Sequence, residues 1–104
     1  MEIKKLNKNN FDEIVFEEEK LVLIDFYADW CGPCKMLSPV IEELAATTNI
    51  DLVIGKVDVE SEPDIARKFN VYSIPTLMLV KNKEVVKIET GYKSKQVLED
   101  FIKV

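Results

Sequence analysis

The strongest constraint on the fold is a run of apolar residues that leads directly into a pair of cysteines. The run covers Leu21 to Ala28 and is interrupted only by Asp25. The cysteines follow as Cys31-Gly32-Pro33-Cys34. A stretch this continuously apolar is typical of a strand covered on both faces, and apolar residues after the cysteines recur at the three- and four-residue steps of a helix. We therefore expect a central strand to deliver two thiols to the first turn of a helix.

The remaining apolar segments predict an alternation of strands and helices. Further strands are expected at Glu2 to Leu6, Leu52 to Val57, Thr76 to Val80 and Glu84 to Thr90. Helices are expected to begin near Asn10, Ser61 and Ser94. The order is βαβαβ followed by ββα, so the first half should form parallel strands with right-handed crossovers and the hairpin should add an antiparallel edge. The sequence thus predicts an α/β fold with helices on both faces of a mixed sheet.

Several residues predict where the helices begin and end. Asn10 with Glu13 and Ser61 with Asp64 resemble capping boxes. Pro63 suits the first turn of a helix, Asn70 suits a left-handed residue that ends a helix, and Ser94 suits an N-cap. The acidic run Glu17 to Glu19 is interpreted as a solvated helix end, and Pro39 should kink the helix after the cysteines. The last helix should turn inward Val97, Leu98, Phe101 and Ile102.

Length and charge limit the classes of function. With 104 residues, the chain has the size of a single domain, residues 1–104, and we expect a monomer. Its net charge of −5 comes from scattered residues and gives no support to nucleic-acid binding, which favours a basic patch. No apolar run approaches the length of a membrane span, and Met1 to Lys8 lack the features of a signal peptide. These observations favour a cytoplasmic protein that binds neither membrane nor nucleic acid.

The two cysteines carry the candidate chemistry. In a reducing cytosol a close cysteine pair is more often catalytic or metal-binding than structural. A zinc site needs four ligands, and this chain has two cysteines and no histidine, so no metal is expected. A structural disulfide across so short a loop would stabilise the fold little. A redox pair is therefore the favoured interpretation, with no cofactor besides a Cys31–Cys34 disulfide.

The position of each cysteine at the helix start predicts its role. Cys31 precedes the helix, where unpaired N–H groups and the positive end of the helix dipole favour a thiolate. Cys34 lies one turn in, should be more covered, and should keep its proton longer. We expect Cys31 to attack a substrate disulfide and Cys34 to resolve the mixed disulfide. Gly32 and Pro33 keep the loop short, and Trp30 beside the thiols would offer contact area.

Asp25 is the second candidate catalytic residue. It could be an edge carboxylate that faces water, but its apolar neighbours occupy both faces of the strand. A carboxylate in apolar surroundings has a raised pKa and can accept a proton. Lys56, near the end of the neighbouring buried strand, could modulate that pKa, or it could extend to solvent instead. With no histidine in the chain, Asp25 is the expected proton acceptor.

Over its whole length the sequence resembles the thioredoxin family. The resemblance rests on Trp30-Cys31-Gly32-Pro33-Cys34-Lys35 and on the spacing of Asp25, Lys56, Ile74-Pro75-Thr76 and Gly91. It implies a thioredoxin fold, in which a five-stranded mixed central sheet is flanked by four helices. It also implies a protein-disulfide reductase that acts on disulfide-containing client proteins and is recycled by a thioredoxin reductase.

The resemblance further implies a substrate-binding groove. Its residues would be Trp30, Gly32, Pro33, Ile74, Pro75 and Gly91. The Ile74-Pro75 bond would be cis, although only about 5% of X–Pro bonds in folded proteins are cis. The catalytic carboxylate would be Asp25, and its neighbouring lysine Lys56.

The sequence also departs from the family pattern. Asn82-Lys83 replaces the usual Asn-Gly hairpin, so Lys83 should adopt a positive φ at some cost. Tyr72 and Tyr92 flank the groove and bear on the choice of partner. Two rival functions stay open, a disulfide oxidase or isomerase on the same fold and a binding module that holds a partner without redox turnover.

Overall fold

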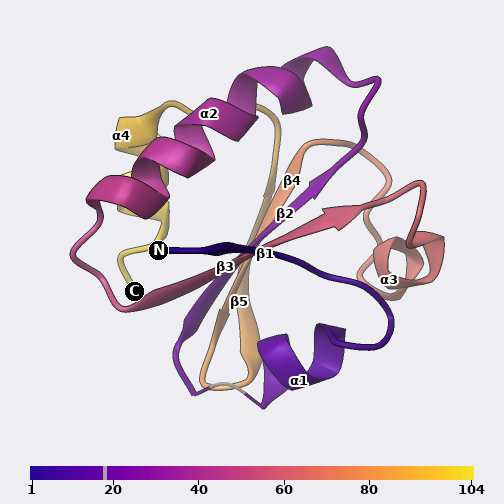
Figure 1. Ribbon diagram of the computed structural model, residues 1–104, viewed down its shortest axis with the longest axis horizontal. Coiled ribbons are helices and arrows are strands. Elements are labelled where there is room, and N and C mark those ends of the chain that lie inside the picture. The colour runs from indigo at the N-terminus through magenta and orange to yellow at the C-terminus, as the bar shows by residue number, and fades with distance from the viewer. Residues whose placement is uncertain (18) are drawn as a thin grey trace.

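The computed structural model describes residues 1–17 and 19–104 and contains a five-stranded sheet with helices on both faces (Figure 1). The elements along the chain are β1 (Ile3–Lys5), α1 (Phe11–Phe16), β2 (Leu21–Tyr27), α2 (Gly32–Thr47), β3 (Leu52–Asp58), α3 (Pro63–Lys68), β4 (Thr76–Lys81), β5 (Glu84–Thr90) and α4 (Lys95–Phe101). This order confirms the predicted α/β fold, a mixed sheet flanked by four helices in the described part of the chain. None of these helices has the length and apolar character that a membrane span requires.

The strand that precedes the cysteines lies in the middle of the sheet. The strand order is β1-β3-β2-β4-β5, with β2 parallel to β3 and antiparallel to β4. β5 pairs antiparallel with β4 and forms one edge. Residues 22–26 of β2 are all buried, as the continuous apolar run predicts. A polar side chain on this strand therefore has no solvent-facing side.

Two different layers cover the sheet. Figure 1 shows α1 and α3 on one side of the strands and α2 with α4 on the other. We call the first side the aromatic face, because Phe11 and Phe69 pack there against Phe26 of β2. We call the second side the thiol face; there Leu37 of α2 and Leu98 of α4 pack against Leu23, Ile54, Leu77 and Leu79. Because side chains alternate along a strand, Asp25 and Tyr27 share the thiol face with Leu23.

The two expected capping boxes do not form. Asn10 occupies the N-cap position of α1, but its side chain makes no cap. Instead its Oδ1 accepts a hydrogen bond from the Asn7 N–H at 2.7 Å, and its amide donates to the Lys5 carbonyl at 3.1 Å. The N-cap of α3 is Glu62 rather than Ser61, because Pro63 occupies the first turn and fixes where the helix begins.

The turns agree with the sequence-based predictions better than the helix starts do. Asn70, Asn82 and Lys83 have φ angles of 57°, 51° and 71°, which confirms the left-handed stop and the strained hairpin. α1 ends at Phe16, and the exposed Glu17 and Glu19 follow, while Glu18 lies outside the described residues. Pro39 lies inside α2.

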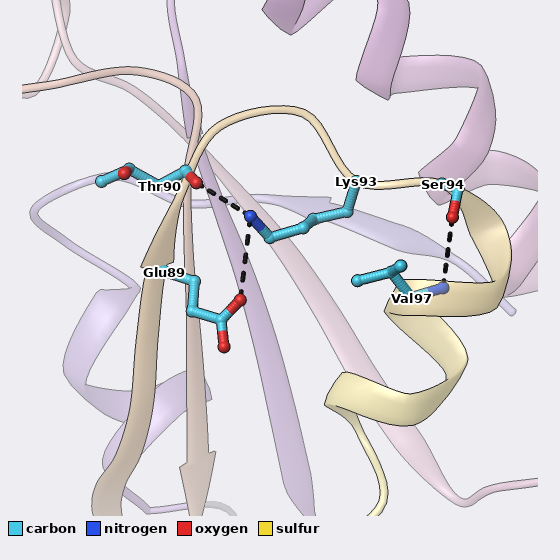
Figure 2. Close-up of polar contacts among 5 residues, drawn as sticks. All are labelled: Glu89, Thr90, Lys93, Ser94 and Val97. Atoms are coloured by element: carbon cyan, nitrogen blue, oxygen red, sulfur yellow. Dashed lines mark hydrogen bonds and ion pairs between the residues drawn. The ribbon is translucent and has the colours of Figure 1, made fainter.

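The last helix differs from its prediction at one residue. Ser94 caps α4 as expected, and its Oγ accepts a hydrogen bond from the Val97 N–H at 3.3 Å (Figure 2). Leu98, Phe101 and Ile102 are buried, but Val97 is 45% exposed. The predicted inner position of Val97 is wrong because a short helix contacts the sheet along a narrow stripe, and Val97 lies at its margin.

Candidate active site

The two cysteines lie where the central strand passes into α2. They form a disulfide with their Cα atoms 5.2 Å apart. Cys31 is the N-cap residue of the 16-residue α2, and Cys34 lies in the first turn. The Sγ of Cys31 accepts a hydrogen bond from the Cys34 N–H at 3.2 Å. Backbone hydrogen bonding and the helix dipole therefore both favour negative charge on Cys31.

The expected difference in exposure between the cysteines is absent. Cys31 is 5% exposed and Cys34 is 4% exposed in the disulfide form. The prediction that Cys34 is clearly the more covered thiol was wrong because it considered only the place of each cysteine at the helix start. Ile74 also covers Cys31, because its carbonyl oxygen lies 3.9 Å from the Cys31 Sγ. A difference between the two thiols must therefore come from the helix end rather than from solvent access.

A cis peptide bond faces the cysteines. The Ile74-Pro75 bond is cis, as the resemblance to thioredoxins implies. Gly91 lies beside it, because its N–H donates a hydrogen bond to the Pro75 carbonyl at 2.8 Å. Gly91 has a φ of 96°, a conformation that favours glycine and ends β5. The structure thus brings Cys31, Ile74, Pro75 and Gly91 together at one end of the sheet.

Lys93 contacts the end of β5 and so holds the segment that follows Gly91. Figure 2 shows the Nζ of Lys93 donating a hydrogen bond to the Thr90 carbonyl at 2.9 Å and lying 3.7 Å from the Glu89 carboxylate. These contacts close a loop around Gly91 and Tyr92, so both ends of the loop are held. The sequence gives no signal for Lys93, because its partners lie three and four residues before it at the end of a strand rather than in a helix.

Around the thiols several side chains remain open to solvent. Trp30 is 68% exposed, and its indole N–H donates a hydrogen bond to the Glu60 carboxylate. Gly32 and Pro33 are also exposed, while Tyr72, just before the cis bond, is 82% exposed. This part of the surface presents aromatic contact area beside the disulfide. Glu60 was not predicted, since only the folded chain brings it next to Trp30.

Asp25 is buried beneath α2, as the sequence predicts. It is 1% exposed, and its Oδ1 accepts no hydrogen bond from any described residue. Burial raises the pKa of Asp25 from 3.8 to about 6, although the positive charge of Lys56 partly opposes the rise. An unpartnered carboxylate inside a protein is costly. At neutral pH this side chain can still lose its proton and can then accept another.

Lys56 is aligned with Asp25 but does not pair with it. The two residues are directly opposite in the parallel ladder between β2 and β3. Among the described residues, the ion pairs do not include Lys56 with Asp25. The Nζ of Lys56 instead lies 3.5 Å from Ser38 Oγ and 4.4 Å from the centre of the Tyr27 ring. Ser38 and Tyr27 were not predicted, although Ser38 is one helical turn after Cys34 and Tyr27 is two strand residues after Asp25.

Tyr27, Ser38 and Lys56 line a pocket on the thiol face. The pocket has a volume of about 380 Å³ and is lined by Tyr27, Ala28, Asp29, Cys34, Lys35, Ser38 and Lys56. Burial and, after it, the negative charges of Asp58, Asp29 and Asp25 raise the pKa of Tyr27. A larger pocket of about 530 Å³ lies at the far end of β2 beside Leu21, Ile50 and Ile102, and no cysteine lines it. Cys34 lines the pocket of about 380 Å³, so this pocket belongs to the site and the one of about 530 Å³ does not.

Within residues 1–17 and 19–104, no three histidine, cysteine or acidic side chains cluster as metal ligands would. The reactive group is the disulfide itself, which needs a thiol partner rather than a bound cofactor. A redox-active disulfide at a helix N-terminus, beside a cis-proline and above a buried carboxylate, defines the class of thiol–disulfide oxidoreductases.

The comparisons with known proteins narrow this class. The thioredoxin family model matches residues 2–104, and the chain belongs to the thioredoxin family. It is 47% identical to a thioredoxin of Mycobacterium bovis over 90% of this chain and 81% of that one. It is 46% identical to a thioredoxin of Bacillus subtilis over 81% of each chain. A solved structure of a mutant thioredoxin from Halobacterium salinarum superposes with a TM-score of 0.88 at 37% identity, covering 97% of this chain and 88% of that one.

Membership of the family establishes the reaction. The chain is a protein-disulfide oxidoreductase that works by dithiol–disulfide exchange through its own Cys31–Cys34 pair, without a cofactor. Thioredoxins as a family act on disulfide-containing substrates. The predicted fold, class of reaction and redox-active disulfide are confirmed.

Proposed function

We propose that the protein is a cytoplasmic, monomeric disulfide reductase, that residues 1–104 act as one domain, and that a thioredoxin reductase recycles it. The reaction begins when the Cys31 thiolate attacks one sulfur of a client disulfide. A mixed disulfide forms and one client thiolate leaves. Cys34 then loses its proton and attacks Cys31 Sγ, which forms the Cys31–Cys34 disulfide and releases the second client thiolate. The client gains two electrons, and the reductase later returns two electrons to the protein.

The N-cap position of Cys31 is the single observation that carries this assignment. Its Sγ accepts the Cys34 N–H at 3.2 Å and lies at the N-terminus of α2. The hydrogen bond stabilises a thiolate on Cys31 and not on Cys34, and the helix dipole acts on Cys31 from the N-cap position. Cys31 is therefore the nucleophile and Cys34 the resolving thiol.

Asp25 is the proposed acceptor of the Cys34 proton. It lies on the sheet face that α2 covers, and it is nearly free of solvent. With a pKa of about 6 it is mostly ionised at neutral pH and can take a proton from a thiol. Lys56 lies next to it in the ladder and limits the rise in its pKa.

The proposed client groove lies around the disulfide. Trp30, Gly32 and Pro33 form one side of it, and Ile74, Pro75 and Gly91 form the other. The exposure of Trp30 and the contact between Ile74 and Cys31 support this arrangement. A client chain in the groove would bring its disulfide to Cys31, and the exposed Tyr72 would contact its flanking residues.

Reduction of insulin disulfides with and without a thioredoxin reductase tests the proposal. Cys31→Ser should abolish reduction and form no mixed disulfide, while Cys34→Ser should trap the client as a stable adduct. Alkylation of the reduced parent at neutral pH should label Cys31 faster than Cys34. Equal labelling rates would contradict the assignment of roles, and an adduct on Cys34 in the Cys31→Ser protein would reverse it. A Cys31→Ser protein that still binds clients tightly without turnover would favour a binding module.

A further inference from the structure

The ammonium group of Lys56 makes two contacts, with Ser38 and Tyr27, that the reaction scheme above does not use. Its Nζ lies 3.5 Å from the hydroxyl oxygen of Ser38 on α2. It also lies 4.4 Å from the centre of the Tyr27 ring on β2, a distance at which a cation is attracted to the ring face. Ser38 and Lys56 are both half-buried, and Lys56 contacts two different elements. The ammonium is therefore held rather than free in solvent.

Lys56 has two ladder partners, the exposed Lys5 on β1 and Asp25 on β2, whose carboxylate has no hydrogen bond at Oδ1. Lys56 and Asp25 are directly opposite in the ladder, on strands that are hydrogen-bonded to each other. In such a setting a lysine would ordinarily approach the carboxylate, because a buried charge without a partner is costly. The described part of the chain contains no such ion pair, and Asp25 Oδ1 has no partner.

We propose that Ser38 is a positioning residue for Lys56: its hydroxyl, together with the Tyr27 ring, holds the ammonium toward the pocket and away from the Asp25 carboxylate. An ammonium next to Asp25 would stabilise the ionised carboxylate and weaken it as a base. By holding Lys56 aside, Ser38 keeps Asp25 a stronger acceptor for the proton of Cys34. This inference rests on the proposed role of Asp25.

Other charges around the pocket do not replace this interaction. The ionisable groups that line it are Tyr27 on β2, Asp29 before α2, Cys34 and Lys35 on α2, and Lys56 on β3. Asp58, at the end of β3, acts on Tyr27 through its charge. Asp29 and Asp58 are negative and raise the pKa of Tyr27 along with Asp25. Lys35 is exposed on α2, whereas Lys56 is the cation whose charge acts on Asp25. A displacement of the Lys56 ammonium group should therefore change the pKa of Asp25 directly.

The test is a titration of Asp25 by carboxyl carbon NMR in the oxidised protein, where the disulfide leaves the cysteines unable to titrate. In Ser38→Ala the ammonium is released, and the Asp25 midpoint should fall by about one pH unit, the low end for an opposite charge at close range. Ser38→Thr keeps a hydroxyl and should restore the parental midpoint. Thr47→Ala removes a hydroxyl from the same helix, where it donates a hydrogen bond to the Glu43 carbonyl, and should leave the midpoint unchanged.

A double variant links the effect to Lys56. Lys56→Met should raise the Asp25 midpoint, and adding Ser38→Ala to Lys56→Met should change nothing further. An unchanged midpoint in Ser38→Ala, or an equal fall with and without Lys56, would overturn the inference.

Kinetics separate this inference from the proposed function. The pH profile of mixed-disulfide resolution should move down with the Asp25 midpoint in Ser38→Ala. If the midpoint falls while the profile stays in place, Ser38 positions Lys56 as inferred, but Asp25 is not the proton acceptor. If Asp25→Asn slows resolution while Ser38→Ala leaves the midpoint unchanged, the proposed function holds and the inference on Ser38 fails.

Discussion

The aromatic face and the thiol face cover the same five strands with different side chains. On the aromatic face Phe11, Phe16, Phe26 and Phe69 meet with ring centroids 5.5 to 6.5 Å apart. On the thiol face, aliphatic side chains fill most of the space under α2 and α4, and Asp25 and Lys56 lie near the end that carries the cysteines. One face is organised for packing alone, whereas the other keeps an unpartnered carboxylate that weakens the fold. Functional sites commonly break the rules that the rest of a structure follows.

The largest effect should come from the aromatic face. Phe26→Ala removes a fully buried ring from β2 and should reduce the free energy of unfolding by about 3–5 kcal/mol. The Asp25 titration midpoint should stay near its parental value, because the two side chains point to opposite faces. Urea unfolding and the carboxyl titration measure the two quantities. A large shift in the midpoint would show that the faces are not independent.

On the thiol face, Asp25→Asn should instead raise the free energy of unfolding. Folding raises the pKa of Asp25 from 3.8 to about 6, so the folded state holds this proton more tightly and the protein loses stability as pH rises through that interval. A rise of this size corresponds to about 3 kcal/mol at pH 8, an order-of-magnitude value. The variant should therefore be more stable than the parent at pH 8 and gain little below pH 3.8.

Urea unfolding of both proteins across this range measures the difference directly. A gain that does not depend on pH would mean that the amide packs better and that the charge of Asp25 is not responsible. No gain at any pH would mean that the carboxylate has hydrogen-bond partners in solution.

A smaller effect is expected at Gly55, on the aromatic face of β3. A Cβ placed there would lie 2.5 Å from Leu6 Cδ1 and 2.8 Å from its Cγ, and Leu6 is buried. Gly55→Ala should therefore cost about 1–3 kcal/mol through overpacking. Thermal or urea unfolding would measure the loss. Adding Leu6→Val should recover part of it, and the absence of any recovery would place the strain elsewhere.

The smallest effect belongs to neither face. Lys83 in the hairpin between β4 and β5 has a φ of 71°, which is unfavourable for a residue with a Cβ. Lys83→Gly should raise the free energy of unfolding by about 1 kcal/mol through relief of this strain, with the entropy of the unfolded chain reducing the gain. Urea unfolding at neutral pH is the measurement. A loss would mean that the exposed ion pair between Lys83 and Glu19 contributes more than the strain costs.

The sequence predicts strands better than it predicts side-chain contacts. The central strand was recognised because a run such as Leu21 to Ala28 can be buried only where both faces are covered. The capping boxes failed because the pattern gives residue types but not direction, and the Asn10 side chain turns back to Asn7 and Lys5. Local pattern therefore predicts the elements, while the hydrogen bonds at their ends depend on the neighbouring chain.

In the candidate site, too, the residues marked by local sequence were predicted, and the contacts from distant parts of the chain were not. Cys31, Cys34 and Asp25 were found from local sequence, because a helix start and an apolar strand are visible there. The burial of Cys31 was missed, since it depends on Ile74, which lies 43 residues away. The cis bond before Pro75 followed from the resemblance and not from the residues. Ser38 was missed because a serine in a helix signals nothing until Lys56 is placed beside it.

The position of Trp30 determines what optical measurements on this protein report. It is the one tryptophan in the sequence, and it lies at the surface beside the disulfide instead of in the core. Its fluorescence therefore monitors the active-site loop, including the oxidation state of the cysteines and the approach of a client. The phenylalanines of the aromatic face emit weakly, so loosening of that face would leave the emission almost unchanged. Fluorescence would then report on the active-site loop during unfolding, whereas circular dichroism would report on the backbone of the whole fold.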